Sequence, residues 1–128
     1  MPDPRLAALA RTIVHHSLRL QPGERLLIEA TDIPPEMVIA LIREARSVEA
    51  VPLVNLKQNL VLREFYRLSD AAGMEEMGRL EAAQMAGVQA YVGLRGAYNS
   101  AELSDVPEEQ MRLYQRLCAP PVHQAIRI

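Results

Sequence analysis

The 128-residue sequence has no tryptophan, one phenylalanine (Phe65) and one cysteine (Cys118). A single cysteine cannot form an internal disulfide, so we expect a reducing compartment, by default the cytoplasm. The longest apolar runs are only a few residues long and too short to span a bilayer. Arg5 and Arg11 interrupt the start of the chain, which argues against a secretory signal. The core must therefore be built mainly from aliphatic side chains and methionine.

Clusters of positive charge and glycine-rich motifs are also missing. Lys and Arg do not cluster along the chain and the formal net charge is -2, so we expect neither a nucleic-acid partner nor a membrane partner. The first predicted strand exits through Glu29–Pro35, which contains no glycine that would let the backbone approach a pyrophosphate. No Walker A motif is present. These absences disfavour dinucleotide and nucleoside triphosphate sites.

Short apolar runs indicate the strands. Leu26–Ile28 is a short continuous apolar run, which is typical of a strand buried on both faces. Val51–Val54 and Val88–Leu94 indicate a second and a third strand. Residues 124–128 look like the start of another strand. Gly87 precedes the third run, and we expect it to end the preceding helix in a left-handed conformation.

Apolar residues at helical spacing fill the stretches between these runs. They predict helices over Pro4–Leu20, over Thr31–Val48 and over residues 58–86, the last broken near Ala72–Gly73. A further helix is expected over Asp105–Cys118, with Cys118 as a buried structural thiol. Strands that alternate with helices form βαβ crossovers. The predicted fold class is therefore α/β: a single domain with a parallel sheet of βαβ units and helices on both faces.

A functional site is expected at the carboxyl ends of the strands, where open parallel sheets bind their ligands. The polar groups there are Glu29–Asp32, Asn55–Lys57 and Arg95–Asn99. They form a plausible rim for a polar small molecule, although such residues also serve as helix caps and turns. From this rim and from the polar segment after it we select Asp32, Arg95, Asn99 and Glu102 as residues of a possible cavity or interface loop.

A metal or acid–base site is not indicated by the spacing of the titratable residues. His15 and His16 are adjacent on a predicted helix and point about 100° apart, so they cannot chelate one ion as an i, i+4 pair could. His123 has no partner nearby in sequence. The pairs Glu75–Glu76 and Glu108–Glu109 sit at expected helix starts, where carboxylates favour the helix dipole. We therefore assign no catalytic and no metal-binding residue in this chain.

Several stretches resemble the amino-terminal domain of the thermophilic-type M29 metallo-aminopeptidases, the aminopeptidase T and aminopeptidase S group. Leu9–Leu18 is similar to the first helix of that family, and Leu20–Glu29 to its helix end, Pro-Gly turn and first strand. Leu41–Ala45 followed by Val51–Val54 fits the next unit. Asn99–Pro107 resembles a segment after the third strand. The order and spacing of these stretches cover nearly the whole chain.

The resemblance implies a two-domain, usually dimeric enzyme that removes amino-terminal residues from peptides with a pair of divalent ions, commonly zinc or cobalt. One ion would polarise the scissile carbonyl, and the pair would lower the pKa of a bridging water. In that family the ligands are Glu, His, Tyr and Asp residues of the carboxy-terminal part. We therefore expect residues 1–128 to form the amino-terminal α/β domain of a larger enzyme. This domain would support the dimer and the cavity without metal ligands of its own, and would be inactive alone.

The alternative is a free-standing α/β module that binds a small molecule or a protein without catalysis. A free module should end with a completed element and a polar tail, whereas this chain ends on the apolar segment Gln124–Ile128. This ending favours the enzyme domain. It also leads us to expect that Ile126 and Ile128 lie on an exposed apolar patch or sheet edge, which would promote self-association.

Overall fold

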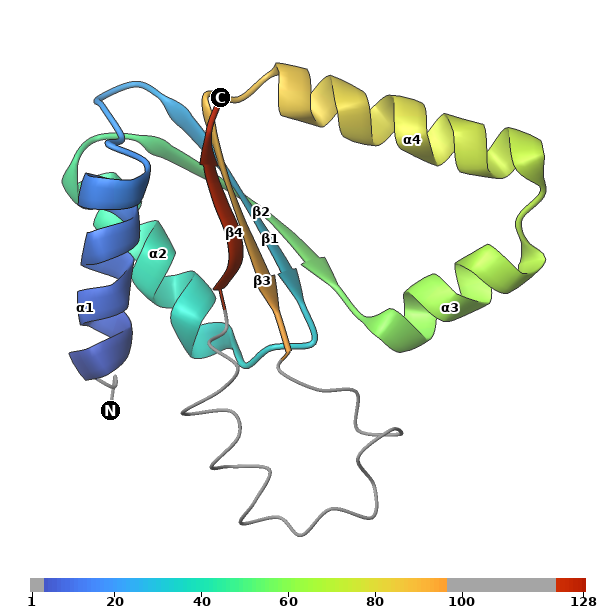
Figure 1. The fold of residues 1–128 in the computed structure, drawn as a ribbon, viewed down its shortest axis with the longest axis horizontal. Helices are drawn as coiled ribbons and strands as arrows, with labels where there is room; N and C mark the ends of the chain where they lie inside the picture. The colour runs from blue at the N-terminus through green and yellow to red at the C-terminus, as the bar shows by residue number, and fades with distance from the viewer. Residues whose placement is uncertain (1–3, 97–121) are drawn as a thin grey trace, which may run out of the picture.

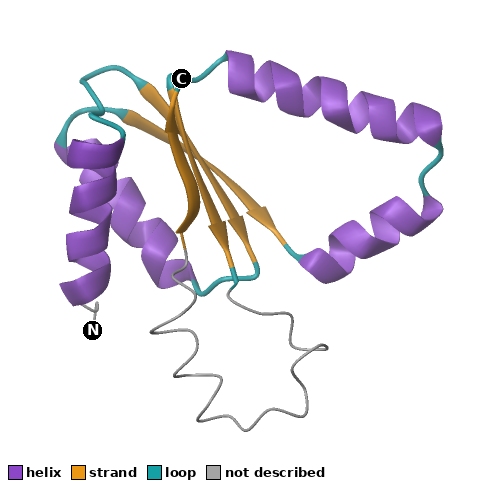
Figure 2. Ribbon diagram, viewed as in Figure 1, coloured by secondary structure: helices purple, strands orange, loops and turns teal. Residues whose placement is uncertain are grey.

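The computed structural model describes residues 4–96 and 122–128, which form one α/β domain (Figures 1 and 2). The elements, in chain order, are α1 (Pro4–Thr12), the π-helical turn η1 (Ile13–Ser17), β1 (Arg25–Thr31), α2 (Pro35–Ser47), β2 (Val51–Lys57), α3 (Asn59–Leu68), α4 (Ala71–Ala86), β3 (Ala90–Arg95) and β4 (Val122–Arg127). The predicted α/β class is confirmed. The helix expected over Asp105–Cys118 lies outside the described residues, as do Asn99 and Glu102.

The four described strands form one sheet in the order β2-β1-β3-β4. β1 is parallel to both β2 and β3, as expected, whereas β4 runs antiparallel to β3. The predicted parallel sheet is therefore confirmed for β1, β2 and β3, and β4 adds an antiparallel strand at its edge. The direction of β4 follows from where the chain returns to the sheet. Strand β4 begins beside Leu94, at the carboxyl end of β3, and ends beside Ala90, at the amino end of β3.

The hydrophobic core lies between one face of the sheet and the pair α1–α2. Leu26 and Ile28 of β1 and Val92 and Leu94 of β3 are fully buried and project towards these helices. Helix α2 contributes the stripe that its spacing predicted, with Met37, Val38, Leu41 and Ala45 all buried. Leu27, on the opposite face of β1, is only 4% exposed, so the central strand is buried on both faces as its continuous apolar run predicted.

Helices α3 and α4 lie on the other side of the sheet from α1 and α2 and extend away from it (Figure 1). Two side-chain contacts tie α4 to β2: Asn55 donates to Gln84 at 2.9 Å, and Lys57 donates to Glu81 at 3.3 Å. Neither helix has a buried residue. The apolar pattern of residues 58–86 therefore predicted helices correctly, but in this chain none of their apolar side chains is fully buried. The more exposed of them are Leu60, Val61, Leu68 and Leu80.

Two details of the predicted helix ends were wrong, and in each case a local hydrogen bond explains the difference. The break between α3 and α4 falls at Ser69–Asp70, because the Asp70 carboxylate accepts from the Gly73 amide at 2.8 Å and so caps α4. Gly73 thereby lies in the first turn of α4 and does not break the helix. Gly87 has φ -87° and is not left-handed, since its amide closes a tight turn onto the Gln84 carbonyl at 3.1 Å. No helix in the described ranges is long and apolar enough to cross a membrane.

An ion pair adds to the β3–β4 ladder in attaching β4 to the rest of the domain. Arg127 donates to both carboxylate oxygens of Glu24, which precedes β1, and Glu24 also accepts from the Gln21 amide at 2.8 Å. Ile126 and Ile128 are 36% and 59% exposed, in line with the expected apolar edge. Whether the chain self-associates through this edge stays a prediction.

The Glu24–Arg127 pair gives a pH-dependent prediction. The hydrogen bond from Arg127 lowers the pKa of Glu24, and the Gln21 amide acts in the same direction against the opposing effect of burial. A lowered folded-state pKa adds stability above the unfolded-state pKa, and this is lost as the pH falls through the folded value. We expect Glu24→Gln to reduce the loss of unfolding free energy between neutral and acid pH, measured by urea titration. The exposed Glu75→Gln should leave that loss unchanged, and equal losses in wild type and Glu24→Gln would contradict the assignment.

Candidate functional site

A cavity of about 810 Å³ opens at the carboxyl ends of the three parallel strands, on the face opposite the core. Its floor is formed by Glu29 and Thr31 of β1, Lys57 of β2 and Arg95 of β3, which the parallel registers place side by side. The chain runs from β1 to β2 on one side and from β3 to β4 on the other. The ends of β1 and β3 therefore mark the point where the strand order reverses, which is where open α/β sheets bind ligands.

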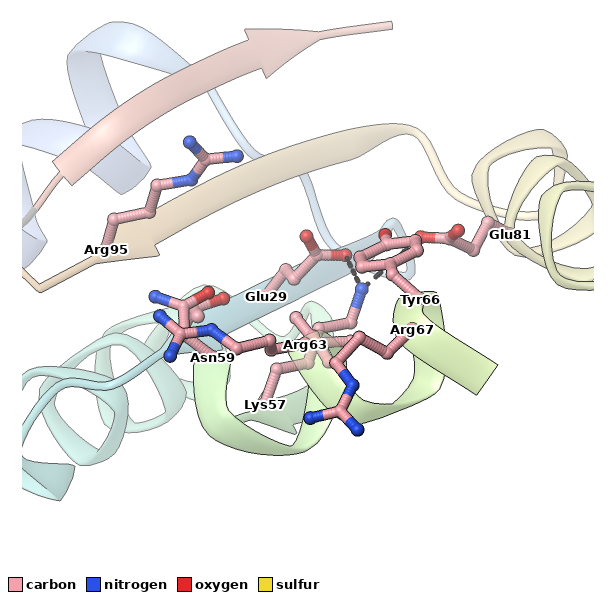
Figure 3. A pocket seen from close by; sticks show the side chains of 10 residues that line it. Glu29, Lys57, Asn59, Arg63, Tyr66, Arg67, Glu81 and Arg95 are labelled. Atoms are coloured by element: carbon pink, nitrogen blue, oxygen red, sulfur yellow. Dashed lines mark hydrogen bonds and ion pairs between the residues drawn. The ribbon is translucent and has the colours of Figure 1, made fainter. Parts of the chain in front are cut away.

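Helix α3 forms a wall of this cavity with one of its faces. Asn59, Arg63 and Arg67 are spaced four residues apart, and Leu62 and Tyr66 fall on the same face between them. Glu81 of α4 completes the lining (Figure 3). Four cationic side chains thus meet two acidic ones. We call this site the arginine cavity; its net charge of +2 contrasts with -2 for the whole chain.

Both carboxylates of the arginine cavity are bound to one ammonium group. The Lys57 Nζ atom lies 3.2 Å from Glu29 and 3.3 Å from Glu81 (Figure 3). Burial disfavours the charged form of Lys57, but the hydrogen bonds and charges of Glu29 and Glu81 outweigh it and raise the pKa of Lys57 above its ordinary value. Lys57 therefore stays protonated at neutral pH and links β1, β2 and α4.

Tyr91 supports Glu29 from the neighbouring strand. Its hydroxyl donates to Glu29 at 3.3 Å, and its pKa is raised first by burial and then by the negative charge of Glu29. The ring packs over Gly93, where an added Cβ would lie 2.9 Å from the hydroxyl oxygen. A side chain at position 93 would thus displace Tyr91 from Glu29.

The arginines of the cavity make fewer ion pairs than Lys57 does. Arg67 lies 3.7 Å from Glu64, one turn earlier on α3, in an exposed pair. Arg63 and Arg95 have no hydrogen-bond or ion-pair partner among the residues that the structure describes. They reach the cavity from two different elements, α3 and β3 (Figure 3). The guanidinium groups of Arg63 and Arg95 could therefore donate hydrogen bonds to an external anion.

Asp32 positions α3. Its carboxylate accepts from the Asn59 amide at 3.1 Å and caps the first turn of α3, while its own amide donates to the Lys57 carbonyl at 3.1 Å. Asp32 has φ 54°, a left-handed conformation that Asp tolerates better than most residues. The sequence indicated either a cap or a cavity residue for Asp32. It is a cap, but of α3 and not of the helix that follows it directly.

Asp32 also lines a second cavity, on the core side of the sheet at the edge of β2. This cavity of about 770 Å³ is mostly apolar, with Ile39, Val54, Leu56 and Val61 among its walls. It places no cluster of charged groups around a common point, so we regard the arginine cavity as the candidate functional site.

Of the four site residues selected from the sequence, Arg95 lines the arginine cavity and Asp32 supports its wall. Asn99 and Glu102 lie outside the described residues. The sequence missed Arg63, Arg67 and Glu81, although the spacing of Arg63 and Arg67 by four residues on a predicted helix was an available signal. The statement that Lys and Arg do not cluster holds along the chain but fails in space.

The family model of the thermophilic metalloproteases (M29) matches residues 2–126. The chain belongs to this family. The match includes the helices and strands that carry the arginine cavity, from β1 to β3. None of the curated proteins matches the M29 chain.

The described side chains do not form a site for the metal that the M29 family implies. In residues 4–96 and 122–128, no three His, Cys, Asp or Glu side chains come close enough to hold an ion. Glu29 and Glu81 face Lys57, and His15 pairs with Glu44 at 2.7 Å. A divalent ion at the arginine cavity would have to displace a protonated lysine among three arginines. We therefore derive no metal-dependent step from these side chains.

Proposed function

We propose that residues 1–128 form the amino-terminal α/β domain of a metal-dependent aminopeptidase that hydrolyses amino-terminal residues from peptides. The observation that carries the proposal is the M29 family match over residues 2–126. The zinc or cobalt ligands of the working enzyme come from its carboxy-terminal part, as the family resemblance implies. This domain alone is inactive, and the enzyme works in the cytoplasm.

The role of this domain is to support a homodimer and to wall the substrate cavity. The arginine cavity supplies a polar wall that suits a small peptide. The exposed apolar side chains of α3 and α4 supply the kind of surface that a second subunit or domain covers, among them Leu60 and Leu68, each more than 70% exposed.

The proposal predicts a difference in activity between two proteins. The 128-residue chain and a longer protein that joins it to the carboxy-terminal, metal-binding part of the proposed enzyme are assayed in parallel for release of amino-terminal residues, with zinc or cobalt added. We expect activity only in the longer product, and we expect a chelator to abolish it, because the metal ions would supply the Lewis acid and the activated water for hydrolysis.

The competing function is a free-standing α/β module that binds a small molecule or a protein without catalysis. It is favoured by the arginine cavity, which is assembled from this chain alone. If the 128-residue chain is the complete product and neither binds metal nor cleaves peptides, the module replaces the enzyme and the peptidase chemistry is dropped.

A further inference from the structure

We propose that the arginine cavity is a binding site for the carboxylate of a peptide, held by Arg63 and Arg95. The choice of a peptide as the molecule that carries the carboxylate rests on the proposed function. The binding of a carboxylate rests only on the cavity itself.

The charge balance of the cavity favours an external anion, because its four cationic side chains outnumber its two acidic ones. Glu29 and Glu81 each pair with Lys57, at 3.2 and 3.3 Å, and not with an arginine of the cavity. Arg63 and Arg95 have no ion-pair partner within the described part of the chain, yet they line the same cavity. A guanidinium group presents a rigid fork of donors that matches a carboxylate in a bidentate geometry.

A phosphate group is less well served than a carboxylate. Phosphate in α/β proteins is bound largely by free backbone amides at the amino end of a helix. The helix whose amino end adjoins the cavity is α3, and its Asn59 amide already donates to Asp32 at 3.1 Å. The charged donors that line the cavity are side chains, and the negative charges of Glu29 and Glu81 disfavour a dianion more than a monoanion.

The size and lining of the cavity favour a ligand larger than a single ion. Its volume of about 810 Å³ lies in the range of pockets that hold small organic ligands. Leu62 and the half-exposed Tyr66 add an apolar surface on α3 beside the arginines. A short peptide could place its carboxylate at Arg63 and Arg95 and its side chains against this surface.

The test measures binding to the 128-residue chain by isothermal titration calorimetry, at low ionic strength and with a chelator present. The probes are a tetrapeptide of alanine and leucine as the free acid, the same peptide as its carboxy-terminal amide, and an amidated peptide with one internal glutamate. Binding of the free acid alone assigns the carboxy-terminal carboxylate. Binding of the glutamate peptide assigns an acidic side chain instead, and either result supports the site.

Variants locate the binding. We expect Arg63→Ala and Arg95→Ala each to raise the Kd of the peptide that binds by about tenfold, the usual effect of losing a charge-assisted hydrogen bond. Arg79→Ala is the matched control, because Arg79 is exposed on α4, pairs with Glu76 and lies outside the cavity. Unchanged thermal midpoints exclude misfolding as the cause of weaker binding.

Three results would overturn the site: no binding of either carboxylate peptide, equal binding of the neutral amide, or equal weakening by Arg79→Ala. Inorganic phosphate that binds where the peptides do not would also overturn it. The measurement needs neither metal nor hydrolysis. The proposal of peptidase activity and the proposal of this binding site can therefore fail independently of each other.

Discussion

Leu41→Ala is expected to lower the free energy of unfolding by about 3 kcal/mol, since Leu-to-Ala changes in well-packed cores cost about 2–5 kcal/mol. Leu41 is fully buried at the centre of the α2 stripe against the sheet. Removing its branched end leaves a void that the surrounding helices and strands cannot close completely. Urea unfolding of the 128-residue chain measures the change.

The same substitution at Leu60 separates the two sides of the sheet. Leu60 is 76% exposed on α3, so Leu60→Ala should change the unfolding free energy by less than about 0.5 kcal/mol in dilute protein. A loss at Leu60 that appears only as the protein concentration rises would support an apolar association surface on α3. A loss equal to that of Leu41→Ala at every concentration would instead show that α3 packs inside the monomer.

Gly96→Ala has the second largest expected effect, a loss of about 2 kcal/mol in the range given by overpacking of tight sites. A Cβ atom at Gly96 would lie 2.7 Å from the Asp32 carbonyl oxygen, closer than real Cβ contacts. That oxygen belongs to the backbone and cannot rotate away. The Gly96 amide also donates to the Thr31 carbonyl at 2.9 Å, so the ends of β1 and β3 would be forced apart.

This change should also weaken binding at the arginine cavity, because Arg95 precedes Gly96 and Asp32 caps α3. Gly78→Ala is the matched control. A Cβ there meets nothing within 4 Å, and α4 should gain about 0.5–1 kcal/mol from the better helix former. The two midpoints, measured by urea unfolding, should move in opposite directions. A Gly96→Ala protein as stable as wild type would show that the two strand ends separate easily.

The core could be predicted from the sequence because burial follows local patterns. The continuous run Leu26–Ile28 and the α2 stripe around Leu41 are buried as their spacing indicated. The same reasoning failed to separate buried from exposed apolar faces on α3 and α4. A helical pattern shows that a face must be covered, but it does not show whether this chain or another covers it.

The floor of the arginine cavity was within reach of the sequence, and its wall was not. Glu29, Lys57 and Arg95 each end a parallel strand, and such ends meet at one edge of a sheet. The contribution of Arg63 depends on where α3 lies and on which of its faces turns to the sheet. That placement depends on the cap from Asp32, 27 residues earlier, which no local pattern reveals.

The sequence by itself determined the α/β class, the strands around the core and the family resemblance, because these depend on periodicity and on short motifs read along the chain. Only the tertiary structure decided that β4 is antiparallel and that Asp32 caps α3. It also decided that Lys57 bridges both cavity carboxylates while Arg63 and Arg95 remain free of partners within the described residues. These features are contacts between distant segments, and their energies depend on distances that exist only once the chain has folded.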